Sequence, residues 1–222
     1  MGYAALFSGG KDSSLALWKA QSLGLPVDYL VTVYPKRKDS YMFHRPNLHL
    51  IPDLSRSIGI ELIKVETSGE KEEEIEDLKN RLKGLDISGI IIGAVASTYQ
   101  LERIEKLAKK LSLEVYAPLW NISERDLLED LLKSGFQTII VSVSALGLDE
   151  DWLGKKIDKR CIERLEKLGD EYGINISGEG GEYETLVLKA PYYDRGFKVT
   201  EKKKSWDGKR GKLLIKKLRR VD

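Results

Sequence analysis

The amino-acid sequence predicts an α/β protein that begins with a doubly wound parallel sheet of about five strands. Short runs rich in Val, Ile and Leu lack polar alternation, as expected of strands buried on both faces, and they lie at 3–7, 29–34, 61–66, 89–93 and 113–116. Stretches with a helical spacing of apolar residues separate them, at 13–22, 48–58, 70–82 and 99–111. Strands that alternate with helices favour parallel pairing through right-handed crossovers, with helices on both faces of the sheet.

A different pattern follows Pro118-Leu119-Trp120 and predicts a second, smaller α+β domain. Ser123 fits a helix N-cap, with Asp126 in the capping-box position, ahead of a helix at 124–133. A strand at 138–143, a helix at about 156–172 and strands at 183–189, 197–202 and 212–218 complete the expected elements. We therefore place the domain boundary near residue 120, giving domains 1–120 and 121–222.

The composition excludes several classes of protein. Lys and Arg number 37 against 35 Asp and Glu, so the chain as a whole carries no polyelectrolyte signal and a nucleic-acid partner is disfavoured. Residues 198–222 are an exception, with 11 basic and 3 acidic residues, which fits either a phosphate-contacting patch or an edge hairpin protected by lysines. No apolar run reaches the ~18 to 20 residues of a membrane span, and the first residues lack the pattern of a signal peptide, so we expect a cytoplasmic protein.

The most informative segment follows the first predicted strand and opens the first predicted helix. In an open parallel sheet this turn points main-chain N–H groups into the crevice where ligands bind, and two glycines let an anion approach closely. A phosphate or pyrophosphate is the expected ligand, although the segment could also be an ordinary tight turn. It differs from the Walker A pattern at Ala5 and Asp12. Its residues are Ser8, Gly9, Gly10, Lys11, Asp12, Ser13 and Ser14.

This segment resembles the Ser-Gly-Gly-x-Asp-Ser loop of the ATP pyrophosphatases. That resemblance implies a HUP-type domain that binds ATP, cleaves it between the α and β phosphates and adenylates a substrate oxygen. All seven loop residues would then belong to the ATP site, with Lys11 and Asp12 catalytic and the other residues around Asp12 holding the pyrophosphate. Because a carboxylate accepts hydrogen bonds but donates none at neutral pH, Asp12 is assigned to Mg²⁺ and not to phosphate.

A second glycine-rich motif lies at 178–188, with Glu179, Glu182, Tyr183 and Glu184 at its centre. On a strand, Glu182 and Glu184 share one face, and Tyr183 and Thr185 share the other. The carboxylates fit a solvated edge, a metal site or a pocket for a substrate cation, and spacing alone does not choose among these.

Together, the two motifs resemble the diphthine-ammonia ligase family, and further similar stretches lie at 40–47, 93–100 and 117–120. The family implies amidation of the diphthine carboxylate on translation elongation factor 2, driven by ATP through an acyl-adenylate. Glu179, Glu182, Tyr183 and Glu184 would then bind the protein substrate, and its trimethylammonium would be the cation. Eukaryotic members carry extra C-terminal domains that this length does not hold, so the chain is similar to the short archaeal form. The sequence leaves a homo-oligomer open.

Four residues outside the two motifs complete the candidate site. Gly93 and Tyr99 follow the fourth strand and are assigned to ATP binding, and Arg103 lies one helical turn after Tyr99, where it would meet phosphate or substrate. Its alternative is a surface ion pair with Glu102 or Glu105. His44, in a polar loop at 35–46, is assigned to phosphate or substrate, the alternative being plain surface. His49 is interpreted as structural.

The one cysteine, Cys161, bears on the nitrogen source. A single thiol excludes an internal disulfide, a Cys-x-x-Cys pair and a zinc ribbon. It lies in a predicted helix with no histidine nearby in sequence, so we expect a buried, inert thiol and free ammonium as the nitrogen donor. Two other functions stay open: an RNA-modifying ATP pyrophosphatase, and a nucleotide sensor without turnover.

Overall fold

The computed structural model describes residues 1–36 and 46–221, and its internal contacts divide the chain into two units. The first consists of Met1–Ser8 with Asp12–Trp120. The second contains the chain from Asn121 onward together with the short segment Gly9–Lys11. Three residues of the predicted phosphate loop therefore pack with the C-terminal half of the sequence. The functions assigned to the two predicted domains stay predictions.

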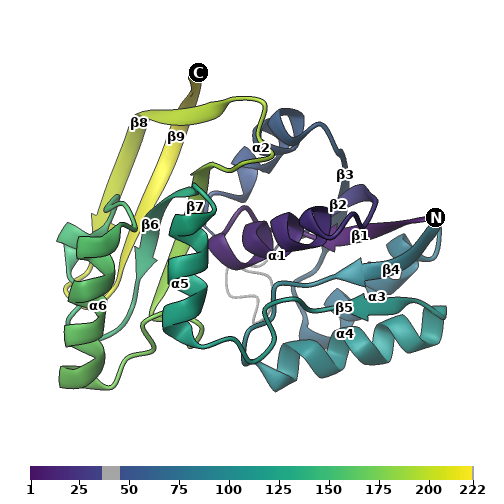
Figure 1. Ribbon diagram of the computed structural model, residues 1–222, viewed down its shortest axis with the longest axis horizontal. Coiled ribbons are helices and arrows are strands. Elements are labelled where there is room, and N and C mark those ends of the chain that lie inside the picture. Colours follow the sequence, from purple (N-terminus) through teal and green to yellow (C-terminus); the bar gives the residue numbers. More distant parts are fainter. Residues whose placement is uncertain (37–45, 222) are drawn as a thin grey trace. The chain divides into compact units, whose positions relative to one another are not determined.

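The first unit contains a five-stranded parallel sheet in the order β3-β2-β1-β4-β5 (Figure 1). This confirms the predicted fold class. The strands are β1 (Gly2–Leu6), β2 (Val27–Pro35), β3 (Glu61–Thr67), β4 (Ile87–Ile91) and β5 (Glu114–Tyr116). The chain moves outward from β1 to β3 and then returns to the other side of β1 as β4. Right-handed crossovers consequently place helices on both faces of the sheet.

Four α-helices of the first unit connect these strands: α1 (Lys11–Ser22), α2 (Ile51–Ile58), α3 (Lys71–Leu82) and α4 (Thr98–Leu111). Helices α3 and α4 pack against each other and bury Leu78, Leu82, Ile104 and Leu107 in the core with strand residues. The predicted helix at 48–58 is instead a 3-10 turn, η1 (Leu48–Leu50), followed by α2. Pro52 explains this break because proline lacks an N–H and fits only the first turn of an α-helix.

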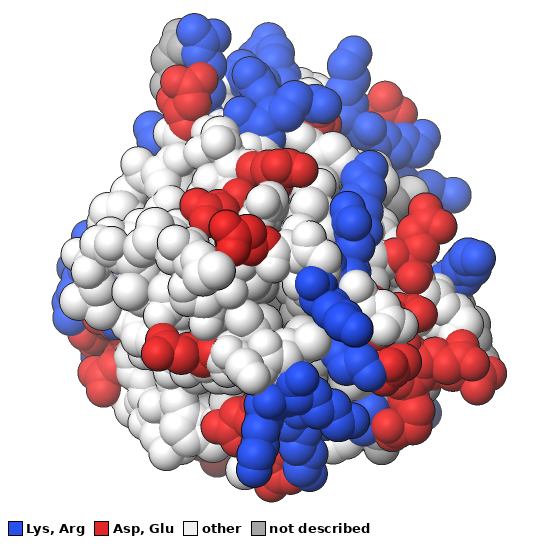
Figure 2. All heavy atoms as spheres, turned by 90° about the vertical axis from the view of Figure 1, so that its right-hand side faces the viewer, with Lys and Arg blue, Asp and Glu red and all other residues white. Residues whose placement is uncertain are grey.

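Charges on the helices of this unit pair locally. On the face of the molecule shown in Figure 2, Lys and Arg side chains are interspersed with Asp and Glu side chains. Lys79 pairs with Glu76 along α3, and Lys106 pairs with Glu102 along α4, at 3.4 Å. Exposed pairs of this kind contribute little individually.

The second unit contains a four-stranded sheet in the order β7-β6-β9-β8, with antiparallel pairing. Its strands are β6 (Gln137–Val143), β7 (Tyr183–Lys189), β8 (Gly196–Trp206) and β9 (Gly211–Val221). The expected α+β arrangement is confirmed, but β8 and β9 extend beyond the predicted 197–202 and 212–218. The run Lys202-Lys203-Lys204 lacks apolar alternation and pairs instead with Ile215, Leu214 and Leu213 across the hairpin. At the hairpin turn, the main-chain N–H groups of Arg210 and Lys209 donate to Asp207 and lower the pKa of its carboxyl.

Two α-helices belong to this sheet, α5 (Glu124–Lys133) and α6 (Lys159–Tyr172), with a 3-10 turn, η2 (Glu150–Trp152), between β6 and α6. The predicted N-cap is confirmed, because Ser123 Oγ accepts from the Asp126 N–H at 3.1 Å. Helix α6 begins three residues later than predicted, where Asp158 caps it by accepting from the Cys161 N–H at 2.8 Å.

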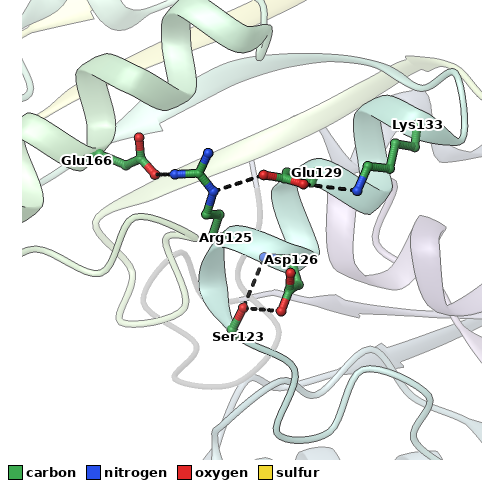
Figure 3. A network of polar contacts seen from close by, with 6 residues as sticks. All are labelled: Ser123, Arg125, Asp126, Glu129, Lys133 and Glu166. Carbon is green, nitrogen blue, oxygen red and sulfur yellow. Dashed lines mark hydrogen bonds and ion pairs between the residues drawn. The ribbon is translucent and has the colours of Figure 1, made fainter.

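An ion-pair network connects the two helices (Figure 3). Arg125 of α5 pairs with Glu166 of α6 and with Glu129, and Lys133 also pairs with Glu129, at 3.0 Å. The side-chain hydrogen bonds from Lys133 and Arg125 lower the pKa of the Glu129 carboxyl. These charges therefore link α5 to α6 and stabilise the exposed side of α5.

Candidate functional site

The turn after β1 has the conformation that its glycines predict. Gly9 has a φ of 73°, a left-handed conformation that side-chain-bearing residues rarely adopt. Ser8 and Ser13 close the turn, because the Ser8 N–H donates to Ser13 Oγ at 3.2 Å and the two hydroxyls lie 3.1 Å apart. Helix α1 begins at Lys11, so the turn leads into a helix N-terminus, where the first N–H groups have no partner within the helix.

The loop after β4 lies against the start of α1. A β-carbon on Gly93 would lie 2.7 Å from the carbonyl carbon of Asp12 and from the nitrogen of Ser13. Glycine is therefore needed here for close main-chain packing. Because β1 lies between β2 and β4, these two loops follow the strands at which the sheet order reverses, the position where open α/β sheets bind ligands.

The side chain of Lys11 is buried, with 3% of its surface exposed, and Ser14 beside it is fully buried. The Lys11 ammonium nitrogen lies 5.8 Å from the centre of the Tyr183 ring, within range of a cation–π interaction. The structure thus brings the lysine of the first motif to the tyrosine of the second.

Two hydrogen bonds within the second unit also join the motifs. The Val187 N–H donates to the Gly9 carbonyl at 2.9 Å, and the Lys11 N–H donates to Thr185 Oγ1 at 3.0 Å. Thr185 and Val187 were not among the predicted site residues. The sequence placed Thr185 on the same strand face as Tyr183, but it held no signal that this face meets Lys11.

The acidic turn before β7 is held together by its own residues. Glu182 Oε1 accepts from the Asn175 N–H at 3.1 Å and lies 2.6 Å from where a β-carbon on Gly180 would be. Glu182 Oε2 is buried without a hydrogen-bond partner among the described residues. The Tyr183 hydroxyl donates to the Ile176 carbonyl at 2.7 Å. Glu182 is thus part of the loop's framework, with its second carboxylate oxygen buried.

Arg103 lies in a partly buried cluster of the first unit. Its guanidinium is 5.2 Å from the Tyr99 ring centre and pairs with Glu72 of α3 at 3.0 Å, with 15% of the Arg103 side chain exposed. The predicted proximity of Tyr99 and Arg103 is confirmed, whereas Glu72 was not foreseen. His44 lies outside the described residues, and His49 is exposed on η1.

Cys161 is buried as predicted, with 2% of its surface exposed. Burial raises the pKa of its thiol to about 11. Because the thiolate is the reactive form, a thiol held protonated in this way is a poor nucleophile at neutral pH.

Asp12 is the carboxylate within the glycine loop, and its side chain is partly exposed in the first turn of α1. Within 1–36 and 46–221, no three His, Cys, Asp or Glu residues gather as a metal-binding group. Mg²⁺ is commonly bound by one or two carboxylates together with substrate phosphates, and the Asp12 carboxylate suits that kind of binding. Among the described residues, no helix is both long and apolar enough to cross a membrane.

These features define a two-unit α/β protein with a glycine-rich loop after the central strand of a parallel sheet. Comparison with known families then identifies it: residues 1–115 match the diphthamide synthase N-terminal domain, and residues 123–221 match the diphthamide synthase C-terminal domain. The chain therefore belongs to the diphthamide synthase family.

Similar proteins support this membership. The chain is 34% identical over 218 residues to the diphthine–ammonia ligases of Bos taurus and Homo sapiens, covering 88% of this chain and 81% of each relative. It is 32% identical to the diphthine–ammonia ligase of Schizosaccharomyces pombe, but covers 36% of that protein. The expectation that eukaryotic relatives are much longer is thus correct for fission yeast and wrong for cattle and human. The archaeal source stays a prediction.

Proposed function

We propose that this protein is a ligase that converts diphthine on translation elongation factor 2 to diphthamide, using ATP and ammonium. Family membership supports the reaction, since the relatives described above are named diphthine–ammonia ligases. The observation that carries the ATP part is the Ser-Gly-Gly-Lys-Asp-Ser turn, which joins β1 to the N-terminus of α1 at the reversal of strand order. Phosphates bind well at such helix N-termini.

The residues present suit a nucleotide's phosphates. Gly9 and Gly10 place no side chain between the main chain and an anion, Ser8 and Ser13 present hydroxyls, and Lys11 supplies a buried positive charge. Asp12 would bind Mg²⁺ that accompanies the phosphates. Gly93 contributes by letting the loop after β4 approach α1, whereas Tyr99 and Arg103 would face nucleotide or substrate from α4.

The chemistry requires activation because a carboxylate has no adequate leaving group for attack by an amine. In the proposed first step, a diphthine carboxylate oxygen attacks the α-phosphorus of ATP, the bond to the bridging oxygen breaks and pyrophosphate leaves. In the second step, ammonia attacks the acyl carbon, the carbon–oxygen bond to AMP breaks, and a proton passes from the nitrogen to solvent as the neutral amide forms. The protein's main task is electrostatic stabilisation of the departing pyrophosphate, for which Lys11 and the α1 N-terminus are suited.

The acidic turn is proposed to recognise the substrate's trimethylammonium. That group carries a permanent positive charge and donates no conventional hydrogen bond, so carboxylates and aromatic faces are its natural partners. Glu179, Glu182 and Glu184 supply three carboxylates within six residues, and Tyr183 supplies an aromatic ring among them.

A product assay tests the proposal. Purified protein, ATP, Mg²⁺, ammonium and diphthine-bearing elongation factor 2 should yield AMP, pyrophosphate and amidated factor in equal amounts. Glutamine should not replace ammonium, and factor that lacks diphthine should yield no AMP. Nucleotide binding without product would instead indicate a sensor, and pyrophosphate release that depends on tRNA would indicate an RNA-modifying enzyme.

A further inference from the structure

Thr185 of β7 holds the main chain of the phosphate loop although 174 residues separate it from Lys11. We propose that Thr185 is a positioning residue that fixes this loop in the conformation that binds a nucleoside triphosphate. The inference rests on the proposed function, since it assumes that the loop binds ATP. It gives the second motif a role in nucleotide binding, in addition to any contact with the protein substrate.

A glycine pair needs such support. Gly9 and Gly10 lose more backbone freedom on ordering than other residues, so a loop built on them is costly to fix in one conformation. The Val187 N–H holds the Gly9 carbonyl, and Thr185 Oγ1 holds the Lys11 N–H, one bond on each side of Gly10. A loop that is already ordered before ATP arrives binds more tightly, because the ordering cost is not paid on binding.

The hydroxyl also determines which part of Lys11 meets the phosphates. Lys11 is the first residue of α1, so its N–H has no acceptor within the helix, and Thr185 supplies one. Because its N–H is bound to Thr185, Lys11 would contact the phosphates through its ammonium group, which lies near the Tyr183 ring. Tyr183 is itself held by its hydrogen bond to Ile176 and by Gly178, where a β-carbon would lie 3.0 Å from the ring.

The decisive substitution is Thr185→Val, which keeps the branched shape but removes the acceptor. The Lys11 N–H would then be left without the threonine oxygen. Thr185→Ser retains the hydroxyl and should restore the bond. Thr200→Val on β8 is the matched control, because it removes a threonine hydroxyl that bonds to the Lys217 carbonyl in the same sheet.

Two measurements are needed, one of them without nucleotide. Amide hydrogen exchange of the nucleotide-free protein reports the Lys11 N–H directly, and calorimetric titration with a non-hydrolysable ATP analogue and Mg²⁺ reports affinity. For Thr185→Val we expect exchange at Lys11 to become at least about tenfold faster and the analogue to bind about tenfold more weakly. Thr185→Ser and Thr200→Val should stay within about twofold of the unmodified protein in both. If Thr185→Val does not fold, Thr185→Ala is compared in the same way.

The failure of this inference is distinguishable from failure of the proposed function. If the unmodified protein binds the analogue and Thr185→Val binds it equally well, the inference is overturned while the function stands. Weak binding by both Thr185→Val and Thr185→Ser would also overturn it, because the hydroxyl would then not be the group that matters. An unmodified protein that binds no analogue would overturn both.

Discussion

Gly93 follows β4 and Asp12 lies in the first turn of α1, and a β-carbon on Gly93 would lie 2.7 Å from the Asp12 carbonyl carbon. Gly93→Ala must therefore displace main chain at the start of α1. We expect the free energy of unfolding to fall by about 1–3 kcal/mol and ATP affinity to fall with it. Urea unfolding and nucleotide titration measure the two effects. Gly84→Ala is the control, since its β-carbon would meet its nearest atom at 3.8 Å, and equal results for both variants would contradict the packing argument.

Asp12→Ala tests the Mg²⁺ assignment. Asp12 is partly exposed in the first turn of α1, so its removal costs a modest helix-end interaction of about 0.3–1 kcal/mol and the fold should persist. Pyrophosphate formation should nevertheless fall at least about hundredfold, because Mg²⁺ would lose its protein ligand. Asp53→Ala, the same change in the first turn of α2, should leave the rate unchanged. Near-normal turnover by folded Asp12→Ala protein would refute the assignment.

The sheet of the first unit was predictable because buried parallel strands have a recognisable local composition. The ends of strands β8 and β9 were harder to predict. Their lysines face solvent, and few apolar residues alternate with polar ones near the strand ends. Pro52 could have indicated the break between η1 and α2, because its missing N–H restricts it to a first turn.

Some residues of the candidate site were predictable from the local sequence, and others were not. The glycine loop is encoded locally, by consecutive residues whose conformational preferences and charges point to an anion. Thr185 and Glu72 act through partners 174 and 31 residues away, so their roles depend on tertiary packing that no local pattern reports. Gly93 was correctly singled out at a strand end, but the reason for glycine there is the nearby Asp12 main chain.

Glu182→Gln and Glu184→Gln test the substrate-cation role. Glutamine keeps an oxygen that accepts from the Asn175 N–H but removes the negative charge. We expect ATP affinity to be unchanged or slightly higher, because ATP is itself an anion, while half-saturation by elongation factor 2 requires about fivefold more factor. Glu163→Gln on exposed α6 is the control.

Two other outcomes for these variants would favour a different interpretation of the acidic turn. Markedly weaker ATP binding by either variant would favour a second metal site. Unchanged kinetic constants in both variants would favour a solvated acidic edge.

Lys198 and Arg219 are directly opposite each other across β8 and β9. Like charges in this position destabilise a ribbon, so Lys198→Glu should raise stability by about 0.5 kcal/mol at low salt. The gain should largely disappear near 1 M salt, where charges are screened beyond ~3 Å. Thermal unfolding at both salt concentrations measures this. Lys203→Glu is the control because Lys203 is opposite Leu214, and an equal gain there would show that net charge, not the cross-strand pair, is responsible.

The buried thiol of Cys161 predicts a loss of stability at alkaline pH. Burial raises its pKa from 9.0 to about 11, so between these values the unfolded chain releases a proton that the folded protein retains. Unfolding is therefore favoured as pH rises: this contribution to stability is intact below about pH 9 and is reduced by about 1 kcal/mol at pH 10. Urea unfolding at pH 7 and pH 10 should show a smaller loss for Cys161→Ala than for the unmodified protein, with tyrosine ionisation common to both. An equal loss in the two proteins would contradict the raised pKa. We also expect near-normal ammonium-dependent activity of Cys161→Ser at pH 7, because a buried, protonated thiol is a poor nucleophile.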